Sequence, residues 1–397
     1  MQPSDRVRTA VFLLATLTLW TAPALSAPPA EDPSRVRAVQ VLVIEEKDIP
    51  SIRSRLRLYR RAGFDTVIVR SFHLPGDRPH LPAGPVPSGA QGVYFPTERA
   101  PVIQDIISPF AAVCREEGMK VYAWMVTRKA RFGNPSIPRD VLFDPEDRTL
   151  RTNSDLDILN AAVEPYLQGL FMDLAATGVD GILLQDDLAS RMTEGFSVTN
   201  LDRYRKETGE TSLPYRHLRS VRGEDGRRYL RADRRFQPWI GWKTKRILAL
   251  ARKLEESATA ANRDIKVAIN LTYETITDPE NGRLWLAHDL KSALRDGPTY
   301  TAVMLYHRQI QEELGLGLPG VLALLERSLA AAEGHLEHRT RIILKFQTQD
   351  WRTGQPVPPG ELMNALTSLW DRGWSIAFVP PPTPEQLPGI RQVLGGF

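Results

Sequence analysis

Two adjacent carboxylates, Asp186 and Asp187, stand directly after a short apolar run in the middle of the chain. The run, Ile182–Leu184, is typical of a strand that is buried on both faces. Unpaired carboxylates inside such a strand would be strongly unfavourable, so we expect the pair where the strand emerges. A lone aspartate at that point would usually cap the next helix. Two carboxylates together indicate acid–base chemistry, because like charges push the pKa values of a pair apart.

Polar and aromatic residues also follow the other short apolar runs of the chain. Aromatic rings stack on sugars, and carboxylates supply the acid and the base or stabiliser of glycoside hydrolysis. The pattern therefore indicates a carbohydrate substrate, with Glu45 and Glu274 as carboxylates in reserve. The candidate substrate-binding residues are Phe72, Trp124, Asn270, Tyr273, Tyr306, Gln347, Gln349 and Trp351.

Other kinds of chemistry lack their motifs in this chain. Its seven histidines form no H-E-x-x-H, and His335 and His338 lie three residues apart on an expected surface loop. There is no G-x-S-x-G, no Walker loop and no dinucleotide fingerprint. We therefore expect neither a bound metal nor a cofactor.

The elements that must position these residues alternate between strand and helix. Eight predicted strands, each followed by a predicted helix, favour a single α/β domain, a (β/α)8 barrel of the TIM type over residues 36–397. The carboxyl ends of such strands share one rim, so the candidate residues should converge there. The strands are expected at 39–44, 66–69, 120–125, 182–184, 265–271, 300–305, 341–346 and 375–379. The helices are expected at 49–62, 103–118, 157–177, 239–256, 284–294, 321–332, 361–372 and 385–394.

The N-terminus has the pattern of a secretory signal peptide. Arg6 and Arg8 precede the apolar run 10–20, and the A-x-A-like end at 24–27 (ALSA) predicts cleavage after Ala27. Residues 28–35 form a Pro-rich leader that we expect to be disordered. No later stretch is long and apolar enough to span a membrane, so a periplasmic or secreted location is expected. The single cysteine, Cys114, excludes an internal disulfide and is expected to be buried in a helix.

An insertion is predicted at residues 188–235, after the fourth strand. Within it, residues 216–235 contain eight arginines and three acids. This segment can be a solvated flap or a rim that contacts a polymer. The formal net charge of +4 is otherwise spread along the chain, so no nucleic-acid partner is indicated.

From about residue 36 to 395 the chain resembles one known family. It is similar to the C-terminal glycoside-hydrolase-like domain of the periplasmic poly-β-1,6-N-acetyl-D-glucosamine N-deacetylases (the PgaB family), which handle biofilm exopolysaccharide. The matching pieces, in the same order, are 93–96 (VYFP), 121–125 (VYAWM), 180–183 (DGIL) with Asp186-Asp187, Asn270, 300–304 (YTAVM) and 347–351 (QTQDW).

The resemblance implies a barrel that cleaves partly de-N-acetylated β-1,6-glucosamine polymer, with Asp186 and Asp187 as the acidic pair. Three places depart from the family pattern: Gln185 where a histidine is usual, Glu45-Glu46 at the first strand exit, and Lys345 in place of an acidic residue. The family's N-terminal deacetylase domain has no counterpart among these residues.

The leading hypothesis is an endo-acting glycoside hydrolase, either retaining or substrate-assisted, with Asp187 as general acid and Asp186 as electrostatic partner. The alternative is a non-catalytic polysaccharide-binding barrel in exopolysaccharide processing or export. Its stacking platforms would be Trp124, Tyr273, Tyr306 and Trp351. A third possibility, a partner in an envelope complex, depends only on the arginine-rich insertion.

Overall fold

The computed structural model describes residues 35–333, 339–370 and 372–395. The predicted signal peptide, residues 28–34 of the predicted leader, and the pair His335 and His338 lie outside these ranges.

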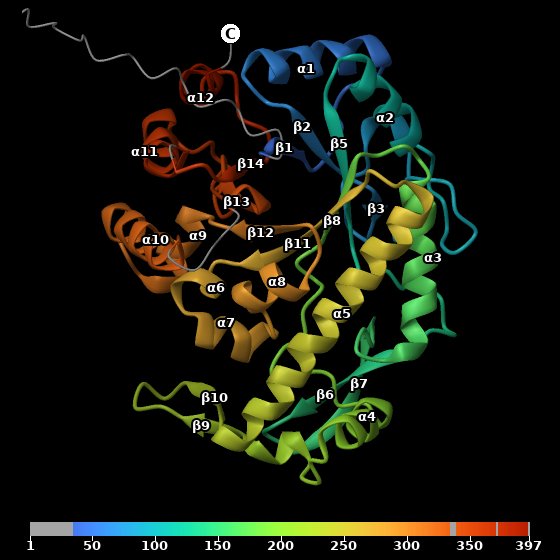
Figure 1. The fold of residues 1–397 in the computed structure, drawn as a ribbon, viewed down its shortest axis with the longest axis vertical. Coiled ribbons are helices and arrows are strands. Elements are labelled where there is room, and N and C mark those ends of the chain that lie inside the picture. Colours follow the sequence, from blue (N-terminus) through green and yellow to red (C-terminus); the bar gives the residue numbers. More distant parts are fainter. Residues whose placement is uncertain (1–34, 334–338, 371, 396–397) are drawn as a thin grey trace, which may run out of the picture. The chain divides into compact units, whose positions relative to one another are not determined.

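Eight parallel strands close into a barrel in chain order, which confirms the predicted (β/α)8 architecture (Figure 1). Each strand pairs with its neighbours in sequence order, and β14 pairs back onto β1, so the barrel has no open edge. The barrel strands are β1 (Arg37–Val41), β2 (Thr66–Arg70), β5 (Lys120–Met125), β8 (Gly181–Leu184), β11 (Lys266–Thr272), β12 (Tyr300–Met304), β13 (Ile342–Gln347) and β14 (Ser375–Val379).

Helices follow every barrel strand. The longer helices are α1 (Ile49–Arg61), α2 (Ile107–Glu116), α3 (Glu164–Ala175), α4 (Val198–Thr208), α5 (Gln237–Ala261), α10 (Leu318–Glu333) and α11 (Pro359–Trp370). The shorter ones are α6 (Glu274–Thr277), α7 (Pro279–Leu286), α8 (Leu290–Asp296), α9 (His307–Leu314) and α12 (Leu387–Leu394). Cys114 is buried in α2, as expected.

Two predicted helices differ from the structure for local reasons. The helix predicted at 157–177 begins only at Glu164, with Pro165 in its first turn, where a missing N–H breaks no helical hydrogen bond. The helix predicted at 284–294 is two helices, because Ala287 takes a left-handed conformation with φ of 56° and ends α7.

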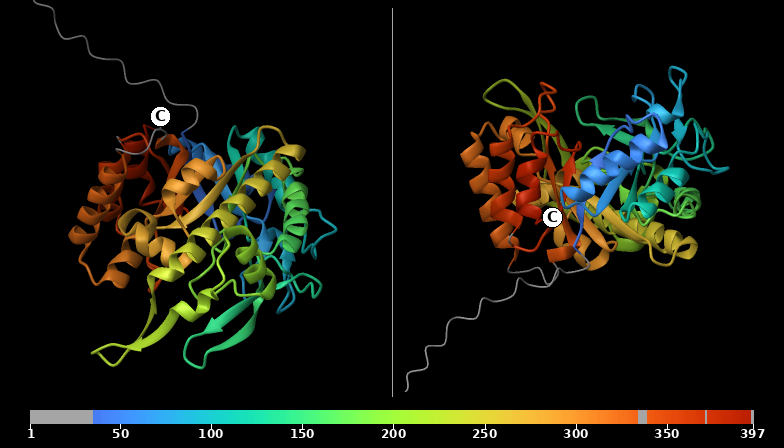
Figure 2. Two further views of the ribbon diagram at one scale, coloured as in Figure 1. Left: turned by 60° about the horizontal axis from the view of Figure 1, so that its bottom comes forward. Right: turned by 90° about the horizontal axis from the view of Figure 1, so that it is seen from above.

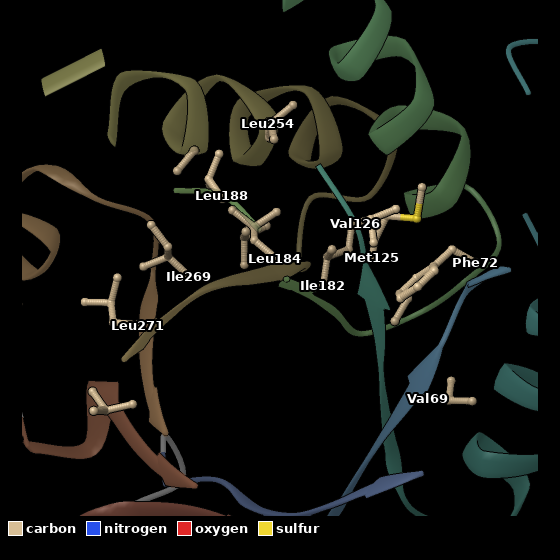
Figure 3. Packing of buried hydrophobic residues seen from close by; sticks show 14 of the residues in the cluster. Val69, Phe72, Met125, Val126, Ile182, Leu184, Leu188, Leu254, Ile269 and Leu271 are labelled. Atoms are coloured by element: carbon tan, nitrogen blue, oxygen red, sulfur yellow. The ribbon is translucent and has the colours of Figure 1, made fainter. Parts of the chain in front are cut away.

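Alternation along the strands divides the core into two parts. Outward-facing residues such as Ile182 and Leu184 pack between the strands and the helices, and Figure 3 shows them on the side of the α5 residue Leu254. Inward-facing residues form a separate small cluster inside the barrel. That cluster consists of Val36, Ala38, Ile68, Tyr122, Leu183, Ala268, Tyr300, Ala302, Ile343 and Ala377.

Three hairpins are added to the loops that follow barrel strands. β3 (Phe72–His73) pairs with β4 (Gly92–Val93) after β2, and β6 (Arg139–Asp144) pairs with β7 (Thr149–Leu156) after β5. The predicted insertion contains α4 and the arginine-rich hairpin of β9 (Leu218–Arg222) and β10 (Arg228–Ala232). Figure 2 shows the β6–β7 hairpin (teal) and the β9–β10 hairpin (olive) projecting on the same side of the barrel. β6 and β7 lie between the strand predicted at 120–125 and the helix predicted at 157–177, where no strand was predicted.

Among the described residues, no single helix is long and apolar enough to cross a membrane. The segments His307–Leu314 and Leu318–Ala332 meet the length and composition criteria only when taken together, and the chain bends by 106° between them.

Gly181→Ala should destabilise the barrel. Gly181 pairs with Tyr122 across β8 and β5, and a Cβ at Gly181 would lie 2.6 Å from atoms of the buried Tyr122 ring. Overpacking of this kind costs about 1–3 kcal/mol. Gly241→Ala is a matched control, because a Cβ there meets nothing within 4 Å inside helix α5, and it should stabilise by about 0.5–1 kcal/mol. Urea unfolding measures both changes, and equal effects would contradict the packing of Tyr122 over Gly181.

Candidate active site

Asp186 is the exposed member of the carboxylate pair. It follows β8, and the chain stays in register up to it because the N–H of Gln185 donates to the carbonyl of Met125 at 2.9 Å. The negative charge of Asp186 acts on two groups from neighbouring strands: it favours the charged form of Lys345 and opposes ionisation of the Tyr306 hydroxyl. Asp186 therefore faces the end of the barrel formed by β12 and β13.

Asp187 faces the loop after β5. Its carboxylate accepts hydrogen bonds from the N–H of Thr127 (3.0 Å), the hydroxyl of Thr127 (2.9 Å) and the N–H of Lys129 (2.8 Å). Burial raises the pKa of Asp187 to about 6, while these hydrogen bonds act in the opposite direction. The side chain therefore ties the loop after β5 to the end of β8.

A buried ionic network extends this connection. Arg128, between the two donors to Asp187, forms ion pairs with Glu194 and with Asp155 of β7 (3.1 Å to Asp155). Lys243 of α5 donates to the carbonyls of Ser190 (3.2 Å), Arg191 (2.6 Å) and Glu194 (3.3 Å). Burial lowers the pKa of Lys243 to about 7, and the nearby carboxylates oppose this change. The network fixes the segment that follows Asp187.

Sequence reasoning missed both cations of this network. Lys243 lies among the apolar positions of α5, next to Trp242 and on the turn after Ile240, and a lysine at such a position was a usable signal. Arg128 gave no comparable signal, because its partner Glu194 is 66 residues away in sequence.

Lys345 lies inside the barrel, on the inward-facing side of β13. Its ammonium is 3.4 Å from the Oδ1 of Asn270 and 5.9 Å from the centre of the Tyr306 ring. Burial lowers the pKa of Lys345 to about 8, and the charge of Asp186 opposes this change. Lys345, Asn270 and Tyr306 thus come from three consecutive strands and meet beside Asp186. From sequence, Lys345 was apparent only as a departure from the family pattern.

Several buried polar atoms near this end of the barrel have no hydrogen-bond partner among the described residues. They are the Nε1 of Trp124, the Oε1 of Gln185, the Oγ1 of Thr272 and the Oε2 of Glu274. These residues belong to the ends of β5, β8 and β11 or follow them directly, and these three strands are neighbours in the barrel. Buried polar atoms are normally paired, so this set is suited to a hydroxyl-rich ligand.

Two of the predicted aromatic residues form the outer part of the site. Trp351 is 40% exposed and its ring meets that of Tyr306 edge-on, with 5.5 Å between centres. A cavity of about 630 Å³ beside Trp351 is lined also by Gln347, Arg308, Asp350 and Glu361. An exposed indole over a cavity of this size can stack on a sugar ring.

Three other predicted residues are held in internal contacts. Phe72 is buried behind Trp124, with 5.3 Å between ring centres, and the Tyr273 hydroxyl donates to Glu313 at 2.8 Å. Gln347 is fully buried and its Oε1 accepts from the N–H of Arg308 at the start of α9.

The remaining residues of the predicted rim lie in loops. Gln349 bonds through its side-chain amide to the carbonyl of Gly354 in its own loop. Glu45 pairs with Arg78 at 2.7 Å and lines a different cavity, of about 460 Å³, near the ends of β1 and β14. The described residues contain no group of three or more His, Cys, Asp or Glu that could hold a metal ion.

Comparisons with known proteins agree with a carbohydrate-active barrel. The model of hypothetical glycosyl hydrolase family 13 matches residues 85–378, which is most of the chain. The glycoside hydrolase domain of PgaB (BpsB) from Bordetella bronchiseptica has a similar structure, with a TM-score of 0.70 at 21% identity over 91% of this chain and 99% of that one.

Two further solved structures share the fold. They are the catalytic domain of β-amylase from Paenibacillus polymyxa (TM-score 0.55, 10% identity, 93% of this chain and 100% of that one) and β-galactosidase from Marinomonas ef1 (0.56, 11%, 91% and 59%). At these identities the likeness establishes the barrel and not the substrate. No curated protein matches the chain.

Asp187→Asn should remove a pH dependence of stability. The folded-state pKa of Asp187 is about 6 against an ordinary 3.8, so between these values the folded protein binds a proton that the unfolded chain does not. Wild-type protein should therefore gain stability relative to the variant as pH falls from about 7 to about 4. Urea unfolding at a series of pH values tests this, with Asp202→Asn on the exposed face of α4 as control. If the difference in free energy of unfolding between wild type and Asp187→Asn does not change with pH, the burial of an ionisable group at this position is contradicted.

Proposed function

Because the chain belongs to hypothetical glycosyl hydrolase family 13, we propose that it hydrolyses a β-linked amino-sugar exopolysaccharide of the partly N-acetylated poly-β-1,6-glucosamine type. The family assignment makes the chain a glycoside hydrolase. The polymer, the periplasmic or secreted location and the residue roles are the proposal. A part in biofilm exopolysaccharide processing follows from the ordered motifs shared with the PgaB family.

The surroundings of Asp186 are the observation on which we base the location of the active site. Asp186 is exposed beside Lys345, Asn270 and Tyr306, near a set of buried polar atoms that have no partner among the described residues. A polysaccharide brings hydroxyl and amide groups that can satisfy these atoms. The exposed indole of Trp351 supports stacking of a sugar farther along the same chain.

The contacts of the two aspartates support different roles from those expected from sequence. Three donors occupy the Asp187 carboxylate, so we assign to it the positioning of the loops after β5 and β8. Asp186 has the freedom to meet the substrate, and we assign to it the proton transfer or charge stabilisation at the scissile bond.

The arrangement supports substrate-assisted hydrolysis. In that route the acetamido oxygen of the sugar attacks the anomeric carbon, so a single exposed carboxylate suffices on the protein side. As the acetamido oxygen bonds to the anomeric carbon, the glycosidic bond breaks and the leaving sugar oxygen takes the proton of the acid. Water then attacks the anomeric carbon, gives its proton back to the carboxylate and opens the cyclic intermediate to the free sugar. A classical retaining route needs a second carboxylate about 5–5.5 Å from the first. Glu274, whose Oε2 is buried without a partner among the described residues, is the candidate for that role.

Asp186→Asn should lower kcat on partly N-acetylated poly-β-1,6-glucosamine by roughly 10²–10⁴-fold, or about 3–5 kcal/mol of barrier. Binding of the polymer should change far less, because ring stacking and hydrogen bonds hold the sugars. Reducing-end release measures the rate, and Asp202→Asn removes an equal charge from an exposed helix as control. If Asp186→Asn keeps more than about half of the wild-type rate, the assignment is wrong, and a barrel that only binds polysaccharide would behave in that way.

Trp351→Ala should act on binding instead of chemistry. Loss of the exposed indole should raise KM about tenfold, equal to about 1.4 kcal/mol, with little change in kcat. Trp351→Phe keeps an aromatic face and should restore most of the affinity. A loss of kcat with unchanged KM would show that Trp351 shapes the reacting centre and does not hold a distant sugar.

A further inference from the structure

Lys345 occupies a position where an uncharged side chain would be easier to bury. It is 2% exposed, and its strand neighbours are Met304 of β12 and Ala377 of β14. Two positions earlier on the same face of β13 is Ile343, in the apolar cluster inside the barrel. Burying an ammonium is unfavourable unless it is well paired, and a methionine would fill this space without that penalty. The lysine therefore needs a reason other than packing.

The ammonium has hydrogen-bonding capacity to spare. It carries three N–H donors, and among the described residues it has one hydrogen bond, to Asn270 at a long 3.4 Å. Asp186 supplies an opposite charge nearby without a hydrogen bond to Lys345. Two donors are thus available to a group that enters from the side of Asp186. An ammonium prefers oxygen acceptors, and a carboxylate or an amide carbonyl satisfies it.

The arginine-rich hairpin adds positive charge to the same end of the barrel. It follows β8, as Asp186 does. Residues 216–235 carry eight arginines against three acids, and of these arginines Arg228 pairs with Glu146 of the neighbouring hairpin. A positive segment of this kind repels a polymer of free amino sugars and favours an acidic or neutral one over it.

We infer that Lys345 determines specificity: it creates a subsite beside Asp186 for a sugar whose substituent offers an oxygen acceptor, an acetamido carbonyl or a carboxylate, and it excludes a sugar that carries a free ammonium group. This inference rests on the proposed function, because it names the sugar that the same site accepts. On a partly N-acetylated polymer, cleavage then occurs where an acylated sugar occupies the subsite and never where a free glucosamine does.

Binding of oligosaccharides that resist hydrolysis tests the inference directly. The probes are S-linked β-1,6 tetrasaccharides in three forms, N-acetylated, N-succinylated and with free amines, measured by calorimetry at about pH 6, where a sugar amine is protonated. Wild-type protein should bind the N-acetylated form at least about 100-fold more tightly than the free amine, because like-charge contacts are strongly unfavourable. Tighter binding of the N-succinylated form than of the N-acetylated form identifies a carboxylate as the preferred acceptor, and the reverse order identifies the neutral carbonyl.

Lys345→Met should reduce the preference for acylated over free-amine probes to less than about tenfold, since the repelling charge is gone. The variant should fold at least as stably as wild type, because a methionine suits the apolar surroundings. Lys266→Met removes the same charge at the exposed start of β11 and should leave the preference unchanged. Equal or tighter binding of the free-amine form to wild type, no binding of any form, or a preference that survives Lys345→Met would each overturn the inference.

Hydrolysis of the ordinary O-linked tetrasaccharides separates this inference from the proposed function. If the N-acetylated probe binds with the expected preference and its O-linked form is not cleaved, the proposed function fails and the role of Lys345 stands. If the free-amine form is cleaved as fast as the N-acetylated form, the role of Lys345 fails and the hydrolase stands.

Discussion

The hydrogen bonds that Thr127 and Lys129 donate to Asp187 connect the loops that leave two neighbouring strands, β5 and β8. The barrel places the ends of these strands side by side, but it does not determine where the chain goes next. Asp187 turns the chain toward the β5 loop, and its neighbour Asp186 is thereby exposed. The direction of Asp186, to which we assign the chemistry, thus depends on the neighbouring carboxylate, which is buried in the hydrogen bonds of the β5 loop.

Burial gives this connection its strength. Arg128, Glu194 and Lys243 form charged contacts that are almost wholly removed from water, and an ion pair in such a place is strongly unfavourable to break. The buried polar groups near Asp186 differ from this network, because their hydrogen-bonding capacity is not filled among the described residues. They are the ammonium of Lys345 and the unpartnered atoms of Trp124, Gln185 and Glu274. The groups around Asp187 are thus engaged in internal contacts, whereas those around Asp186 retain polar atoms that a ligand can bind.

The barrel was predictable because strand and helix periods differ and eight alternations leave few topologies. The meeting of Asp186, Asn270 and Tyr306 near one end followed from the same rule. The contacts of individual side chains did not, because they depend on register and on the turns after each strand. Gln347 follows an apolar run and was expected to bind substrate, but its amide accepts from the start of α9, which comes from the preceding strand. The β6–β7 hairpin was missed because 149–156 is polar at nearly every position and shows no alternation.

The anchor at Lys243 has an evolutionary consequence. Its ammonium binds carbonyl oxygens of Ser190, Arg191 and Glu194, and a carbonyl is present whatever side chain the residue carries. The side chain of Arg191 is exposed, so it can be substituted while the path of the segment is kept, whereas Ser190 is buried and less free to change. A loop held in this manner can change its exposed side chains, and Asp186 stays in place while it does so.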